Sequence, residues 1–262
     1  MSVNEVTLEV SGSIARVTLN RPENANVLNT AMGREMLEVA LRCAADPRVR
    51  AVVLTGAGKH FCFGGDLRGM ISGGGAIQAH LTELTSYLHQ AISQFVRMDA
   101  PVIAAVNGTA AGGGVGLVTM SDLALCGESA KFSLAYSGVA LTPDCSSSFF
   151  LPRIVGARRA TELLLTNRVL GAKEALEWGL VNGVVPDAEL GAEAMKLAEK
   201  LAAGPLRAFG KSKRLVAASL GALETHMALE AETIAAQAAS VEGREGISAF
   251  LEKRKANYSG AG

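Results

Sequence analysis

The chain has 262 residues, of which 49% are hydrophobic and 19% are charged, so it can bury a substantial core and is not disordered. Its 25 basic residues balance 25 acidic ones without a basic stripe, and we therefore expect no nucleic-acid partner. No uncharged apolar run reaches the roughly 20 residues that cross a bilayer, and the N-terminus MSVNEVTLEV lacks a secretory pattern. These features predict a soluble, cytoplasmic protein with no membrane partner.

The first segments of the chain predict a hairpin followed by a helix. Residues 6–10 and 14–19 are rich in β-formers and are joined by Ser-Gly-Ser, which is typical of a hairpin turn. A helix is expected from about Thr30, because apolar residues recur at helical spacing after it. The Asp46-Pro47 pair should end this helix.

The next segments alternate between strand and helix. Residues 51–55 and 102–106 are apolar strands, and Pro101 precedes the second of them. Between them, we expect a flexible loop at residues 72–75 and a helix whose apolar stripe consists of Leu81, Leu84, Leu88, Ile92 and Phe95. Apolar strands connected through helices indicate a mainly parallel sheet with right-handed crossovers.

Beyond residue 151 the pattern becomes helical. Helices are expected at 158–166, 172–178, 190–201 and 206–220, with only 181–185 resembling a strand. We therefore predict an α/β body over residues 1–190 and a helical C-terminal region over 191–262. The last helices are rich in alanine and lack bulky core residues, which favours burial against another subunit.

The four cysteines and four histidines indicate no metal site. Cys43, Cys62, Cys126 and Cys145 form no C-x-x-C pair, so we expect reduced and mostly buried thiols. His80 and His89 lie off the apolar stripe of their helix and are expected to face solvent.

Two glycine clusters, each directly after an apolar strand, are the most informative motifs. They lie in AVVLTGAGKHFCFGGDL (51–67) and PVIAAVNGTAAGGGVGL (101–117), and neither fits a nucleotide-binding fingerprint. Glycine lets backbone N–H groups approach a ligand closely, and the first N–H groups of a helix have no partner inside it. The amides of Gly65 and Gly113 could therefore hold one oxygen atom between them, as an oxyanion hole does.

Five collinear blocks, covering nearly the whole chain, resemble the crotonase family, the enoyl-CoA hydratase/isomerase superfamily. They are LNRPENANVLN (19–29), GKHFCFGGDL (58–67), PVIAAVNGTAAGGG (101–114), LPRIVGARRATELLLTNRVLGAKEALEWGLVNGVV (151–185) and AFLEKRKANY (249–258). The resemblance implies an α/β spiral of ββα units with a helical C-terminal oligomerisation region, as a homotrimer or a dimer of trimers. It also implies an acyl-CoA thioester substrate, in which coenzyme A enters as part of the substrate and not as a separate cofactor.

The resemblance also assigns the site residues. It implies that Gly65 and Gly113 hold the enolate oxygen of the thioester. The residues expected along the pantetheine and adenine path are Ala25, Phe63, Asp66 and Leu67. Phe250 and Lys253 are expected to reach the nucleotide end, often from a neighbouring subunit.

The departures from the family pattern point to a particular reaction. Hydratases of this family carry two glutamates, at positions that correspond here to Gly116 and Tyr136. Asp144 follows Pro143 in TPDCSSSFFLPR, which resembles enoyl-CoA isomerases, and most closely the ring isomerases of phenylacetate catabolism. In those relatives an acid at this position is the catalytic acid/base. Glu23 stands where relatives often carry a lysine or another residue that contacts coenzyme A, which argues against that phosphate contact here.

Several residues have more than one possible role. Asp144 also fits the N-cap of the helix that begins with SSSFFL. Cys145 has no histidine near it in sequence, which disfavours a thiolate nucleophile. Tyr136 is a poor base near neutral pH, because the usual pKa of its phenol is about 10, and is expected to orient the substrate.

The favoured hypothesis is an enzyme that shifts a C=C bond in an enoyl-CoA, with Asp144 as the single acid/base. The alternatives are an enoyl-CoA hydratase that works with one acid, an enzyme that uses Asp144 as a covalent nucleophile as aryl-CoA dehalogenases do, and a catalytically silent acyl-CoA-binding oligomer.

Overall fold

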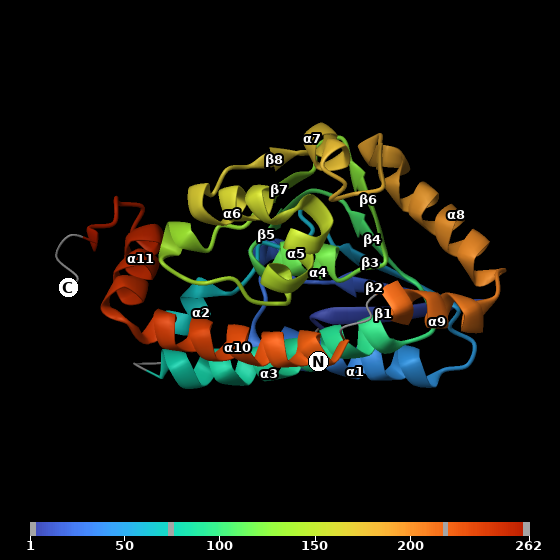
Figure 1. The fold of residues 1–262 in the computed structure, drawn as a ribbon, viewed down its shortest axis with the longest axis horizontal. Helices are drawn as coiled ribbons and strands as arrows, with labels where there is room; N and C mark the ends of the chain where they lie inside the picture. Colours follow the sequence, from blue (N-terminus) through green and yellow to red (C-terminus); the bar gives the residue numbers. More distant parts are fainter. Residues whose placement is uncertain (1–3, 73–75, 217–219, 259–262) are drawn as a thin grey trace.

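The computed structural model describes residues 4–72, 76–216 and 220–258, which form two sheets with helices on both sides (Figure 1). The strands are β1 Val6–Ser11, β2 Ile14–Leu19, β3 Ala51–Gly56, β4 Val102–Val106, β5 Thr109–Ala111, β6 Leu123–Gly127, β7 Lys131–Ser133, β8 Leu170–Gly171 and β9 Gly183–Val185. The helices are α1 Thr30–Ala45, α2 Leu67–Ser72, α3 Ile77–Arg97, α4 Gly113–Thr119, α5 Ser147–Val155, α6 Ala157–Thr166, α7 Ala172–Glu177, α8 Leu190–Ala202, α9 Leu206–Val216, α10 Leu220–Ala239 and α11 Val241–Leu251, with 3₁₀ turns η1 Pro22–Asn24, η2 Ser137–Val139 and η3 Asp187–Glu189.

The larger sheet has the strand order β1-β2-β3-β4-β6-β9, and a smaller one has the order β5-β7-β8. β1 and β2 form the expected antiparallel hairpin, and the other pairs of the larger sheet are parallel. Two strands followed by a helix recur as β1-β2-α1, β4-β5-α4 and β6-β7-α5, with the second strand of the later units entering the smaller sheet. The predicted mainly parallel sheet is therefore confirmed.

Both faces of the larger sheet are buried, which explains its continuous apolar strands. Side chains of a strand alternate between the two faces, so in β3 Val52 and Leu54 join the main core while Val53 joins a second core. The second core is closed by α8, whose Ala194 and Ala198 pack on this face. The small alanine side chains let α8 lie close to the sheet.

Local signals set both ends of α1. α1 begins where Asn29 Oδ1 accepts the Met32 N–H at 2.8 Å, and ends at Ala45 before the Asp46-Pro47 pair, as expected. The expected loop at 72–75 is shorter at its start, because Ser72 still belongs to α2, and residues 73–75 lie outside the described residues. The helix expected over 206–220 is α9, which ends at Val216 before residues 217–219, also outside the described ones. The segment 181–185 contributes only the three residues of β9.

His89 corrects one expectation. It is buried, with 8% of its surface exposed, because α10 packs along α3 on that side (Figure 1). Burial lowers the pKa of its imidazole to about 4. The sequence of α3 alone could not show that a helix from the other end of the chain covers this face. His80 is half-buried.

The cysteine prediction is confirmed: all four are free and buried. Over residues 4–72, 76–216 and 220–258, no group of three or more His, Cys, Asp or Glu side chains is placed to hold a metal ion. Among the same residues, no helix is long and apolar enough to cross a membrane.

Asn26 ties the turn after η1 to the loop that follows β3. It is fully buried, and its Nδ2 donates to the carbonyl oxygens of Ala57 and His60 at 2.9 and 2.8 Å, while its Oδ1 accepts the Arg21 N–H. These bonds hold the two segments that precede Gly65 against each other.

We predict that Asn26→Ala lowers the free energy of unfolding by about 1–3 kcal/mol, because it leaves buried carbonyl groups without a donor. Urea denaturation measures this change. Asn24→Ala is the matched control, since Asn24 is exposed and its side chain makes only a long contact with Glu23. Equal stability of the two variants would contradict the structural role given to Asn26.

Candidate functional site

The two glycine clusters lie against each other. The Ala111 N–H donates to Cys62 O at 2.8 Å, and the Phe61 N–H donates to Thr109 O at 3.1 Å, so the two clusters are joined by backbone hydrogen bonds. A methyl group on Gly64 would lie 2.8 Å from Ala111 O and 3.2 Å from Gly113 N, and Gly64 has a φ of +81°. This contact therefore requires glycine at position 64.

The amides of Gly65 and Gly113 are available to a ligand. Gly65 precedes α2, and Gly113 is the first residue of α4. Neither N–H donates a hydrogen bond to any residue in the described part of the chain. Both residues line one cavity, and amides of this kind can donate to an oxygen atom that carries developing negative charge.

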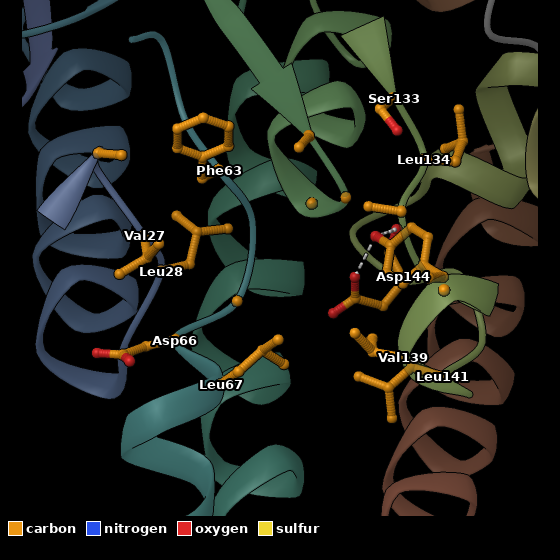
Figure 2. A pocket seen from close by; sticks show the side chains of 18 of the residues that line it. Val27, Leu28, Phe63, Asp66, Leu67, Ser133, Leu134, Val139, Leu141 and Asp144 are labelled. Carbon is orange, nitrogen blue, oxygen red and sulfur yellow. Dashed lines mark hydrogen bonds between the residues drawn. The ribbon is translucent and has the colours of Figure 1, made fainter. Parts of the chain in front are cut away.

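The cavity has a volume of about 780 Å³ and is largely apolar (Figure 2). Its inner wall includes Leu81, Leu84 and Leu88 from α3, the apolar stripe that the sequence indicated. Its outer part includes the exposed side chains of Arg68 and Lys131 together with Glu23. The sequence analysis missed Arg68 and Lys131, because single basic residues in amphipathic segments form no motif.

The structure brings nearly all the predicted site residues together. Those that line the cavity are Ala25, Phe63, Gly65, Asp66, Leu67, Gly113, Tyr136, Asp144 and Phe250. Phe250 comes from α11 of the same chain and is 60% exposed. Lys253 lies past the end of α11, is exposed, and is not among the residues that line the cavity.

Asp144 and Asp66 lie on opposite sides of the cavity and differ in their surroundings (Figure 2). The Asp66 carboxylate accepts the Gly69 N–H in the first turn of α2 and lies 3.5 Å from Arg21 Nη1. Asp144 is buried, and it accepts a hydrogen bond from the Tyr136 hydroxyl at 2.5 Å on Oδ1. Of the carboxylates among the described lining residues, Asp144 alone is buried.

Burial raises the pKa of Asp144, and the hydrogen bond from Tyr136 offsets part of this rise. Burial and the nearby Asp144 charge raise the pKa of Tyr136 well above its ordinary value, so the phenol keeps its proton and acts as a donor. The same two causes raise the pKa of the Cys145 thiol, which disfavours a thiolate nucleophile, as expected.

The alternative prediction that the Asp144 side chain caps the N-terminus of α5 is wrong. α5 has Ser146 at its N-cap position, without a side-chain cap of its own. The Asp144 side chain instead faces Tyr136, and only its backbone carbonyl oxygen accepts from the N–H of Ser147, at 3.0 Å. The backbone N–H groups of Ser146 and Ser148 are bound by Glu230 from α10, which no short sequence motif could indicate.

Gly116 has no room for a side chain. A methyl group there would lie 2.3 Å from the carbonyl oxygen of Cys145 and 2.8 Å from its Cβ. The space next to α4 into which a residue at position 116 would project is thus filled by the backbone that follows Asp144. A carboxylate at this position would require that backbone to move.

Comparison with known proteins places this geometry in a family. The family model described as enoyl-CoA hydratase/isomerase matches residues 9–261. The chain is 37% identical to 4-chlorobenzoyl coenzyme A dehalogenase-2 of an Arthrobacter species, over 96% of this chain and 92% of that protein. It is 36% identical to the 1,2-epoxyphenylacetyl-CoA isomerase of Escherichia coli K12, over 96% of this chain and 97% of the other.

A solved structure gives the same result. The crystal structure of an enoyl-CoA hydratase from Mycobacterium avium subsp. paratuberculosis superposes with a TM-score of 0.88 at 31% identity, covering 98% of this chain and 99% of that one. The expected spiral of ββα units with a helical C-terminal region is therefore confirmed. The chain belongs to the enoyl-CoA hydratase/isomerase family, the crotonase superfamily, and is an enzyme of that family.

Proposed function

We propose that this enzyme shifts a C=C bond in an enoyl-CoA thioester, with Asp144 as its single acid/base. The observation that carries this proposal is the buried Asp144 carboxylate, which shares an apolar cavity with the unpartnered amides of Gly65 and Gly113. The packed space at Gly116 supports it further, because the resemblance places one of the two hydratase glutamates there.

The chemistry needs one carboxylate and one oxyanion site. Asp144 removes a proton from the carbon next to the thioester carbonyl of a 3-enoyl-CoA, and the electron pair moves onto the carbonyl oxygen. The amides of Gly65 and Gly113 stabilise the resulting enolate, and each such donor contributes roughly 10²- to 10³-fold in rate. The same proton returns two carbons away as the double bond moves, so no water is consumed.

The lining residues suit an acyl-CoA thioester as substrate, with coenzyme A as part of it and no separate cofactor. The acyl group would lie against Leu81, Leu84 and Leu88, and the cationic side chains of Arg68 and Lys131 at the outer end would complement the phosphates of coenzyme A. Pantetheine would pass along Ala25, Phe63 and Leu67. Lys253 does not line the cavity. We therefore propose that it contacts the nucleotide part of coenzyme A outside the cavity, or in the site of a neighbouring subunit.

A homotrimer or a dimer of trimers remains the proposal for the assembly. It is supported by apolar side chains that this chain leaves exposed, among them Leu165, Val216 and Leu229. Burying such side chains between subunits removes apolar surface from water.

A dehalogenase is the second candidate, favoured by the 37% identity to the Arthrobacter enzymes. Asp144 would then attack the aryl carbon that carries the halogen, the carbon–halogen bond would break with release of halide, and a second group would have to activate water to hydrolyse the aryl ester. Within the described lining of the cavity there is no histidine to take that role. A hydratase that works with a single acid is the third candidate. It is disfavoured because the positions of the two hydratase glutamates are Gly116 and Tyr136 in this chain.

We predict that Asp144→Asn lowers the kcat for isomerisation of a 3-enoyl-CoA by at least about 10²- to 10⁴-fold, because the amide cannot take the proton. The affinity for product CoA thioester, measured by calorimetry, should be unchanged. Wild-type enzyme is assayed in parallel with 2-enoyl-CoA and 4-chlorobenzoyl-CoA. Isomerase activity retained by the variant would disprove the proposal, whereas preferred hydration or chloride release with a covalent adduct would select one of the alternatives.

We predict that Tyr136→Phe raises the pKa of Asp144 further, because it removes the hydrogen bond that stabilises the ionised carboxylate. Asp144 must be ionised to act as a base, so the acidic limb of the profile of kcat against pH moves to higher pH. Tyr87→Phe, on a half-buried tyrosine of α3 outside the cavity lining, is the control and should leave the profile unchanged. An unmoved limb in Tyr136→Phe would contradict the role of this hydroxyl.

We predict that Gly116→Ala lowers the free energy of unfolding by about 1–3 kcal/mol, as overpacking does. It should also lower kcat, because the added methyl group displaces Cys145 and the adjoining Asp144. Gly191→Ala in α8 is the control, since nothing lies within 4 Å of a methyl group there. Denaturation and isomerase assays of both variants test this, and a stable, fully active Gly116→Ala enzyme would refute the packing argument.

A further inference from the structure

The segment that carries Tyr136 and Asp144 has an unusual backbone. Ala135, Ala140, Cys145 and Ser146 have φ values of 54°, 54°, 52° and 60°, in the left-handed region that residues with a side chain rarely adopt. A residue in this conformation is strained and persists only where its surroundings hold it. The conformation that aims Asp144 into the cavity therefore needs support from other elements.

Glu230 of α10 gives this support next to Asp144. It is buried, with 5% of its surface exposed, and its Oε2 accepts the Ser146 N–H at 2.7 Å while its Oε1 accepts the Ser148 N–H at 3.1 Å. The Ser148 hydroxyl donates to Oε1 as well. The carboxylate thus caps the N-terminus of α5, where negative charge is favourable, in place of a local N-cap side chain.

A second contact from the C-terminal helices holds the other end of the segment. Gln237 Nε2, two turns after Glu230 on α10, donates to Ala140 O at 3.0 Å. A methyl group on Gly246 of α11 would lie 2.5 Å from Val139 O, so this helix also packs closely on the segment. Hydrogen bonds therefore join the strained backbone on both sides of Asp144 to α10. Glu230 itself does not line the cavity.

We propose that Glu230 is a positioning residue for Asp144: by binding the N–H groups of Ser146 and Ser148, it holds Cys145 and Ser146 in the left-handed turn that directs the carboxyl group into the cavity. This inference rests on the proposed role of Asp144 as the acid/base. It links the chemistry of the cavity to the C-terminal helices, which supply the cap from more than 80 residues farther along the chain, since Ser146 and Glu230 are separated by 84 positions.

The charges around Glu230 make the effect dependent on pH. His226 lies on the same helix as Glu230, and its Nε2 is 3.6 Å from the Glu230 carboxylate. Burial and the positive charge of Arg153 in α5 lower the pKa of the His226 imidazole. Asp144 and Cys145 face it from the loop. Burial, aided by the Asp144 charge, raises the pKa of Glu230 to about 7. Above this pH both oxygens are charged acceptors, and below it one oxygen carries a proton, so the carboxyl group holds the two N–H groups more weakly.

The test compares Glu230→Gln with Glu230→Asp, and with Glu232→Gln as the matched control. Glu232 is exposed on the same helix, and its side chain forms no hydrogen bond or ion pair with the described residues. For 3-enoyl-CoA isomerisation, Glu230→Gln should lower kcat about 10- to 100-fold, the loss expected from a misplacement of about 1 Å, with KM unchanged. Because glutamine has no carboxyl group to protonate near pH 7, the acidic limb of the kcat profile should also move to lower pH, opposite to Tyr136→Phe. A merely structural role would change only the thermal midpoint.

Glu230→Asp keeps the charge but withdraws it by one methylene, so its kcat should lie between those of wild type and Glu230→Gln, with the acidic limb unmoved. If Glu230→Gln does not fold, this variant carries the test, and a wild-type kcat then overturns the inference. Wild-type kcat and pH profile in a folded Glu230→Gln enzyme overturn it directly. Asp144→Asn is assayed beside them: retained activity there refutes the proposed function, whereas an inactive Asp144→Asn with an unaffected Glu230→Gln refutes only the positioning role.

Discussion

The contact between Cys145 and the glycine-rich start of α4 is the constraint on which the rest of the site depends. A methyl group at Gly116 would overlap the carbonyl oxygen of Cys145, and one at Gly113 would lie 3.0 Å from its Sγ. This close approach is open only to glycine, and it brings Asp144 to the cavity that Gly113, the first residue of α4, also lines. The same packing leaves no space for a carboxylate at position 116. One arrangement of the backbone therefore both brings the Asp144 carboxyl group to the cavity and excludes a second carboxyl group at position 116.

The conformation of the site is unfavourable in free energy, and contacts from elements distant in the sequence offset this. The left-handed residues around Asp144 and the burial of its carboxyl group are each unfavourable in isolation. Tyr136 stabilises the ionised carboxylate from one side, and Glu230 and Gln237 bind the backbone from α10. The C-terminal helices therefore have a second task besides covering apolar surface, because they also hold the segment in which the proposed acid/base lies.

Family membership leaves the reaction open. Proteins of similar identity to this chain are described as a dehalogenase and as an isomerase, and a closely superposing structure as a hydratase. In our proposal the fold presents the amides of Gly65 and Gly113 to a thioester, so the reaction depends on which side chains stand beside them. In this chain those are Asp144, Tyr136 and the space filled at Gly116, which is why the proposal rests on these three positions.

Much of this protein could be predicted from its sequence, because the signals involved are local. Glycine after an apolar strand, the hairpin turn and the Asn29 cap each depend on neighbours in the chain. The motif blocks contain Gly65 and Gly113, and Asp144 lies between two of these blocks, in TPDCSSSFFLPR. The sequence by itself thus determined the parallel sheet, the family and the candidate acid. Tertiary structure alone decided that α10 buries His89, that Glu230 and not Asp144 caps α5, and that Cys145 fills the space at Gly116. The physical reason is that each of these contacts joins residues dozens of positions apart or more, or depends on exact backbone placement, and no local pattern of residue types encodes such a meeting.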